Sequence, residues 1–146
     1  MNVGVVCTRP AICVSTSATL AEVATLMKDK HVGAVIVTTG GSACPRVVGI
    51  ITDRDIVRAQ LAHAADLSRL DAGEGMTGQP LVFEEREPIE GAIAHLRARG
   101  VRRAPVLGAD GKVVGLVSID DLLRYLVTTL VSIAGIIVGQ VRNEPA

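Results

Sequence analysis

The chain has almost no aromatic side chains. Aromatic residues make up 1% of the 146 residues, with one Tyr, one Phe and no Trp. Proteins that hold single-stranded nucleic acids stack the bases on aromatic rings, so this mode of binding is disfavoured. Positive charge is not in surplus either, because lysine plus arginine and aspartate plus glutamate both total 15. Since displacing counterions from a nucleic acid needs such a surplus, the composition argues against general nucleic-acid binding. A bound base would have to rest on aliphatic side chains and backbone.

Cysteine is also scarce. Cys7, Cys13 and Cys44 are an odd number, lack the spacing of a metal site and sit among apolar neighbours, so a disulfide or a zinc role is disfavoured. We interpret them as reduced thiols in a cytoplasmic protein. The N-terminus lacks a basic start followed by a long apolar run, so no signal peptide is expected.

The recurrent motifs of catalysis are missing from the sequence. It contains no nucleophile elbow, no metal-spaced His cluster, no Walker A loop with its lysine and no Gly-x-Gly-x-x-Gly. We therefore expect neither enzyme activity nor a bound metal. An enzyme acting on a bound nucleotide is retained as a minor alternative.

What the chain does have is an internal repeat. Gly49–Asp55 and Gly115–Asp121 are each a short apolar strand that breaks at a hydroxyl residue, with a carboxylate three positions later. Two further pairs of segments match in the same order: Val32–Val37 with Val101–Val106, and Leu20–Met27 with Ile89–Leu96. The repeat predicts a pseudo-symmetric pair whose functional sites lie where the two copies face each other.

Hydrophobic periodicity and turn residues predict the same elements in both copies. Thr19 and Glu22 form a capping-box pattern ahead of a helix, and Asp110-Gly111 is a strong signal for a tight hairpin turn. In the first copy we expect a helix from Thr19 to about residue 30, strands at 32–38 and 47–51, and a helix from Thr52 to about residue 65. In the second we expect a helix that starts at Glu87-Pro88 with proline as its first helical residue, strands at 101–107 and 113–117, and a long final helix from Ser118.

The hydroxyl and carboxylate of each repeated motif have two interpretations that the residues alone leave open. Thr52 with Asp55, and Ser118 with Asp121, have the spacing of helix capping boxes, which need no ligand. A strand that runs into a helix N-terminus also offers free N–H groups for a phosphate, and an aspartate in the first turn can accept both hydrogen bonds of a ribose diol.

The two motifs differ in charge, so their sites are expected to differ. Arg54 lies in the first turn of its helix, where a cation is mildly unfavourable unless a phosphate is bound there. The second copy has Asp120 at the matching position, which would repel a phosphate. Arg102 and Arg103 align with Gly33 and Ala34 of the first copy, so a pseudo-twofold relation would place them near the central cleft; the alternative is a solvated strand start.

The last helix carries a run without charge, from Tyr125 to Val141. Polar residues interrupt this run, and the helix continues from Ser118 in the folded domain, so a membrane span is disfavoured. We expect instead a stripe that packs against a second subunit: Leu126, Leu130, Ala134, Ile137 and Val141.

The paired motifs resemble those of the CBS-domain pair, or Bateman module. Gly-x-x-Thr-x-x-Asp at Gly49–Asp55 and Gly-x-x-Ser-x-x-Asp at Gly115–Asp121 carry the resemblance, together with Thr8-Arg9-Pro10 and Thr77–Pro80, which open the copies. It covers about residues 5 to 127. The resemblance implies an α/β (α+β) fold of two β-α-β-β-α motifs. We place these at residues 1–65 and 76–127, joined by a connection at 66–75 and followed by a helical extension and tail at 128–146.

The resemblance also implies a function. Such pairs bind adenosine ligands as effectors, so AMP, ADP, ATP, NAD or S-adenosylmethionine is expected here. Carried over, the ribose and phosphate contacts fall to Thr52, Arg54 and Asp55, and to Ser118 and Asp121. The cleft between the strands is then lined by Gly33, Ala34, Arg102, Arg103, Ala104 and Pro105, and the resemblance makes its two arginines candidates for phosphate binding. We expect a regulatory homodimer that signals to an effector protein in trans. The alternative is a ligand-free scaffold that uses the apolar C-terminal helix.

Overall fold

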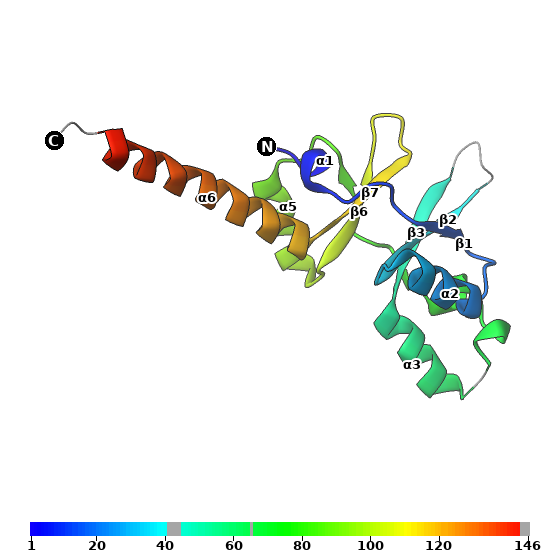
Figure 1. Cartoon of the computed structure of the whole chain (residues 1–146). Coiled ribbons are helices and arrows are strands. Elements are labelled where there is room, and N and C mark those ends of the chain that lie inside the picture. The colour runs from blue at the N-terminus through cyan, green and yellow to red at the C-terminus, as the bar shows by residue number, and fades with distance from the viewer. Residues whose placement is uncertain (41–44, 65, 144–146) are drawn as a thin grey trace.

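Two small β-sheets, each flanked by helices, make up the body of the protein, and a long helix extends from the second of them (Figure 1). The computed structural model describes residues 1–40, 45–64 and 66–143, so Cys44 and most of the connection between the strands expected at 32–38 and 47–51 lie outside the described residues. In chain order the elements are α1 (Val3–Val6), β1 (Cys13–Ser15), α2 (Leu20–Lys30), β2 (Ala34–Thr39), β3 (Arg46–Thr52), α3 (Asp53–His63), the 3-10 turn η1 (Leu67–Arg69), α4 (Ala72–Gly75), β4 (Thr77–Gly78), β5 (Phe83–Glu84), α5 (Ile89–Arg99), β6 (Arg103–Leu107), β7 (Val113–Ser118) and α6 (Ile119–Asn143).

The first sheet has the strand order β1-β2-β3-β4. β1 and β2 are parallel and are joined through α2, whereas β2 and β3 are antiparallel neighbours. The β-branched run of β2 is buried along most of its length, as its continuous apolar sequence predicts. Leu20 and Val23 of α2 pack against it in one core cluster with Ile51 and Ile56.

The second sheet repeats this plan with the order β5-β6-β7. β5 and β6 are parallel and are joined through α5, and β6 pairs with β7 antiparallel. The predicted sequence of helix, strand, strand and helix is therefore confirmed in both copies, and the mixed α+β fold class with it. One detail of the prediction was wrong, because Pro88 is the extended N-cap residue of α5 and not its first helical residue.

Each half of the chain contributes residues to the packing of the other half. Val3 is fully buried in the second core cluster, its N–H donates to the Glu87 carbonyl at 2.9 Å, and Thr8 N–H donates to the Leu116 carbonyl at 2.9 Å. In return Ala72 of the connection is buried in the first core cluster, and β4 of the second copy pairs with β3 through Gly49 and Gly78. The two copies are thereby held as one module.

The contact between the N-terminal segment and β7 can be tested at Gly115. A Cβ there would lie 2.6 Å from Cys7 Sγ and 2.8 Å from the backbone oxygen of Thr8. Because a backbone atom cannot move away cheaply, Gly115→Ala is expected to lower the free energy of unfolding by about 1–3 kcal/mol. Gly78→Ala is the matched control, since a Cβ at Gly78 meets nothing within 4 Å. Urea unfolding should separate the two variants; equal stability would contradict the close approach of Thr8 to β7.

Candidate functional site

The motif of the first copy places its hydroxyl and carboxylate at the start of α3. Thr52 donates to Asp55 Oδ2 through its backbone N–H at 2.8 Å and through its hydroxyl at 2.9 Å, and Asp55 N–H donates to Thr52 Oγ1 at 3.3 Å. The expected capping box is therefore formed. Among the described residues nothing bonds the second carboxylate oxygen, Asp55 Oδ1, which stays open to a ligand.

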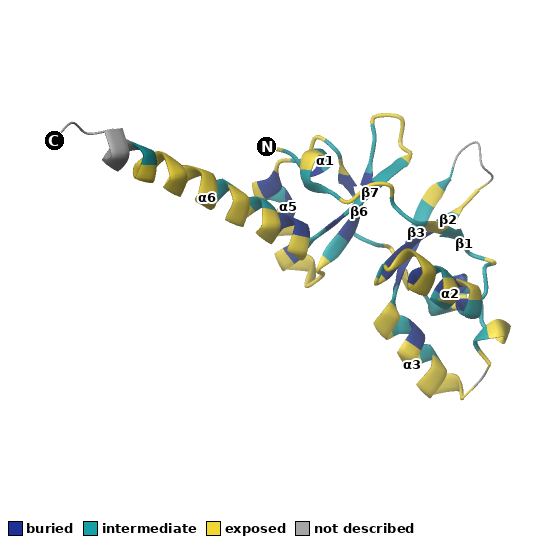
Figure 2. Ribbon diagram, in the orientation of Figure 1, coloured by how far each residue is buried: buried dark blue, intermediate teal, exposed yellow. Residues whose placement is uncertain are grey.

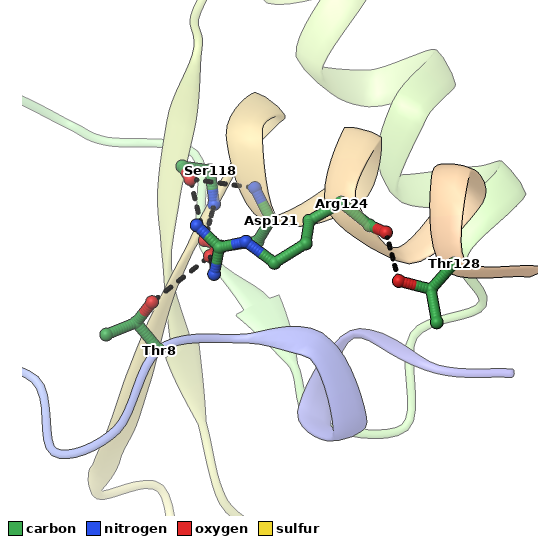
Figure 3. A network of polar contacts seen from close by, with 5 residues as sticks. All are labelled: Thr8, Ser118, Asp121, Arg124 and Thr128. Carbon is green, nitrogen blue, oxygen red and sulfur yellow. Dashed lines mark hydrogen bonds and ion pairs between the residues drawn. The ribbon is translucent and has the colours of Figure 1, made fainter.

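The motif of the second copy has the same cap but a more occupied carboxylate (Figure 3). Asp121 Oδ2 accepts from Ser118 N–H at 2.9 Å and from Ser118 Oγ at 2.6 Å. Its Oδ1 accepts from the Thr8 hydroxyl at 3.1 Å and lies 3.9 Å from Nη1 of Arg124. With 8% of Asp121 exposed, both oxygens have partners within the protein. The two predicted sites thus share a cap and differ in how freely the aspartate can meet a ligand.

A pocket joins the start of α3 to the region between α5 and β6. It is lined by Ile50, Thr52, Asp53, Arg54, Asp55, Arg58, Thr77, Pro80, Leu81, Gly100, Val101, Arg102 and Arg103. We call this the first pocket. Its four arginines exceed its two aspartates, and none of the four guanidinium groups has an ion pair or hydrogen bond to another described residue. Unpaired guanidinium groups around a cavity favour a ligand with phosphate groups.

A second pocket is formed in the equivalent place of the other copy. It is lined by Thr8, Pro10, Ala11, Ile12, His31, Val32, Gly33, Ala34, Arg103, Leu116, Ser118, Asp120 and Asp121. Its lining has one arginine, Arg103, and two aspartates, so the charge balance of the first pocket is reversed. His31 ends α2 in the left-handed conformation, with φ of 54°, where the equivalent residue at the end of α5 is Gly100, with φ of 63°. The second pocket therefore carries a side chain that the first one lacks.

The structure brings most of the predicted site residues together. Thr52, Arg54, Asp55, Arg102 and Arg103 line the first pocket. The second pocket is lined by Gly33, Ala34, Ser118 and Asp121, with Arg103 again. Ala104 and Pro105 line neither of the two pockets, because they are fully buried within β6.

Several lining residues were not predicted. Arg58 stands four residues after Arg54, so both lie on the same face of α3, and this spacing was a usable signal. Asp53 directly precedes Arg54 as an acidic residue in the first turn of α3, and the repeated motif assigned it no role. Thr8 was noted as the start of a copy, but its bond to Asp121 spans 113 positions of sequence. No local pattern indicates such a contact.

A second candidate surface lies on α6, which leaves the body of the protein after its first turns (Figures 1 and 2). Asp121 and Leu122 are buried and anchor it, whereas nearly all later described positions are exposed. Six aliphatic residues alternate at intervals of four and three and are between 39% and 65% exposed: Ile119, Leu123, Leu126, Leu130, Ile133 and Ile137. We call these six residues the α6 seam, since such alternation places side chains along one line of a helix.

The predicted stripe overlaps this seam only in part. Leu126, Leu130 and Ile137 belong to both, whereas Ala134 lies beside the seam and the side chain of Val141 is outside the described part of the structure. By length and composition alone, Ile119–Gly139 is also sufficient to cross a bilayer.

Comparison with known proteins places the chain among relatives. The family model of the CBS domain matches residues 3–62 and 67–128. Hypoxic response protein 1 of Mycobacterium tuberculosis is 30% identical over 126 residues, which are 86% of this chain and 81% of the relative. The CBS domain protein PAE2072 from Pyrobaculum aerophilum, solved in complex with AMP, is 27% identical with a TM-score of 0.75, over 90% of this chain and 99% of that chain.

A third similar protein is a hexameric CBS-CP12 protein from bloom-forming cyanobacteria. It is 26% identical with a TM-score of 0.74, over 84% of this chain and 66% of that chain. The chain likewise spans 66% of the uncharacterized protein MK0525 of Methanopyrus kandleri. Since the family model covers both copies of the repeat, the chain belongs to the CBS domain family and contains a pair of CBS domains.

Proposed function

We propose that this protein is a regulatory module that binds an adenosine nucleotide, of the AMP, ADP, ATP or NAD type, in the first pocket. The observation that carries the proposal is the meeting of four arginines with an aspartate: the guanidinium groups and Asp55 Oδ1 have no partner within the described part of the chain. The carboxylate of Asp55 accepts hydrogen bonds that the ribose hydroxyls donate, and the guanidinium groups bind the phosphates. The AMP complex of the similar protein PAE2072 supports the class of ligand.

The base has aliphatic surroundings in this pocket. Ile50, Leu81 and Val101 line it with Pro80, and no aromatic ring is among the lining residues that the structure describes. An adenine held there rests on apolar side chains and bonds to backbone groups. This arrangement agrees with the near absence of aromatic residues from the chain.

The second pocket takes a different ligand under the same proposal. Asp120 and Asp121 oppose a phosphate, so a phosphate-free or cationic adenosine derivative such as S-adenosylmethionine suits this pocket better. The sulfonium group of S-adenosylmethionine would lie near these carboxylates. Its ribose would contact Ser118 and the solvent-exposed edge of the pocket. The two pockets would therefore select different adenosine ligands according to the charge of the ligand.

The module acts in trans under this proposal, in the cytoplasm and without turnover of the ligand. The ligand shifts the equilibrium between two arrangements of the copies because it binds one arrangement more tightly than the other. The shifted state would be recognised by an effector protein. The α6 seam pairs copies of the chain into a homodimer, because alternating aliphatic positions are covered best by a helix with the same pattern. The exposed seam also favours a second candidate function, a scaffold that assembles through α6 without a ligand.

Calorimetric titration with adenosine, AMP, ADP, ATP, NAD and S-adenosylmethionine tests the binding function. Affinity for the first pocket should rise along the series from adenosine to ATP, by about tenfold or more overall, because each added phosphate meets further guanidinium groups. High salt should reduce this gain. No binding of any of the six ligands by the folded protein would contradict the proposal and leave the scaffold function.

A further inference from the structure

Among the described residues that line the two pockets, Arg103 alone belongs to both. It is the first residue of β6, and its guanidinium lies at the boundary between the copies. A Cβ added at Gly33 would be 3.7 Å from Arg103 Nη1 and 3.7 Å from Asp53 Oδ2. Gly33 lines the second pocket and Asp53 the first. The guanidinium is therefore close to both sites.

The repeat explains why only one arginine occupies this place. Ala34 pairs with Thr52 in the first sheet, and Arg103 pairs with Ser118 in the second, so Ala34 and Arg103 hold equivalent positions. In the same alignment Gly33 corresponds to Arg102. The first copy thus has two small residues where the second has two arginines. The space above Gly33 and Ala34 is left free for the side chain of Arg103 from the other copy.

The side chain of Arg103 is not fixed by the protein. It is partly exposed, and within the described chain it has no ion pair or hydrogen bond. The other charged residues that line the first pocket are three arginines, Arg54, Arg58 and Arg102, and two aspartates, Asp53 and Asp55. Those that line the second pocket are two aspartates, Asp120 and Asp121. Without a ligand, the negative balance of the second pocket favours the guanidinium there, and a phosphate in the first pocket reverses that preference.

We propose that Arg103 is a phosphate-binding residue shared by the two sites, and that it couples them. A phosphorylated ligand in the first pocket draws the guanidinium to itself and leaves the second pocket with its two carboxylates. Two phosphorylated ligands then compete for one cation, so the second binds more weakly. A cationic, phosphate-free adenosine ligand binds the second pocket more tightly once the first is filled. This inference rests on the proposed nucleotide binding and adds to it the ligand class and the regulation of the second site.

The test measures S-adenosylmethionine binding by calorimetry in the absence and presence of saturating ATP. For the unaltered protein we expect ATP to raise the affinity for S-adenosylmethionine about tenfold, within the 5–150-fold range of typical coupling. AMP alone should show two sites, the second about tenfold weaker. In Arg103→Gln the affinity for S-adenosylmethionine should be high already without ATP, and ATP should no longer change it.

Arg102→Gln is the matched control, because Arg102 is the neighbouring arginine and lines the first pocket only. It should weaken ATP binding and leave the ATP effect on S-adenosylmethionine in place at saturating ATP. Circular dichroism and urea unfolding should show both variants folded. Equal S-adenosylmethionine affinity with and without ATP, the same loss of coupling in both variants, or a single ligand per chain in every mixture would each overturn the shared arginine. If ATP binds in these cases, the proposed function stands; if no ligand binds, both proposals fail.

Discussion

Asp55→Ala is expected to weaken nucleotide binding at the first pocket about 100-fold or more. The carboxylate offers Oδ1, which nothing among the described residues engages, to the ribose diol. Hydrogen bonds to a charged group contribute about 1.5–3 kcal/mol each, and loss of even one or two such bonds has an effect of this size. Calorimetry with the tightest ligand of the adenosine series measures it directly. The four arginines remain in the variant, so residual binding should keep its salt dependence.

The same substitution also removes a helix cap, so it needs a control with the same structural cost. Glu22→Ala provides one, because Thr19 and Glu22 form an equivalent capping box at the start of α2 in the same copy. Thr19 N–H donates to Glu22 Oε2 at 2.8 Å, as Thr52 N–H does to Asp55 Oδ2 at 2.8 Å. Both variants should lose about 0.5–2 kcal/mol of stability, and only Asp55→Ala should lose affinity. Equal affinities in the two variants would reduce the motif to a helix cap.

The sequence predicted those parts of the fold that have a local signal. The capping boxes at Thr19, Thr52 and Ser118 each rest on residues three positions apart, and each is formed in the structure. The long apolar or periodic runs of β2, α3 and α6 were equally visible. The short elements have no local signal: β4 and β5 have two residues each, too few for any periodicity to be read. A strand ahead of α5 was implied only by the family resemblance.

The packing of the N-terminal segment could not be predicted for a different reason. The sequence of α1 is a short apolar stretch that would suit either copy, and its place is decided by bonds to Glu85, Glu87 and Leu116. These partners are distant in sequence. The hydroxyl of Thr8 reaches Asp121 only because of this packing, so the difference between the two aspartates is a product of tertiary structure.

For the candidate site too, the sequence predicted the local features and not those that depend on tertiary structure. Charge differences between Arg54 and Asp120 were readable from the aligned motifs, and the structure places each in a separate pocket. The sequence did not predict that Arg103 lines both pockets, because the alignment of the two copies places this residue only at the start of one strand. Its reach across the boundary brings Nη1 to 3.7 Å from the position of a Cβ at Gly33, a contact between the two copies that no local pattern indicates.

Leu130→Asp is expected to convert the proposed homodimer to monomers. Leu130 is near the middle of the α6 seam and is 65% exposed in the single chain, so in the dimer it would be covered by the partner helix. An unpaired charge in a buried interface costs about 3–5 kcal/mol, which is roughly a 100- to 5000-fold loss of affinity. Sedimentation or light scattering over a range of concentrations should show the mass of a single chain for the variant.

Thr128→Asp places the same charge two residues away, on the side of α6 opposite the seam. Thr128 is exposed, and its hydroxyl donates to the Arg124 carbonyl at 2.9 Å. The charge remains in water when the seams pair, so this variant should stay dimeric. Insertion of α6 into a bilayer predicts a different result, since an aspartate near the centre of a span costs about 2.5–3.5 kcal/mol on any face. If α6 inserts, the unaltered protein should float with phosphatidylcholine–phosphatidylglycerol vesicles, and neither variant should do so. A dimer that is lost in Leu130→Asp and kept in Thr128→Asp, without flotation, assigns the seam to a second copy of the chain.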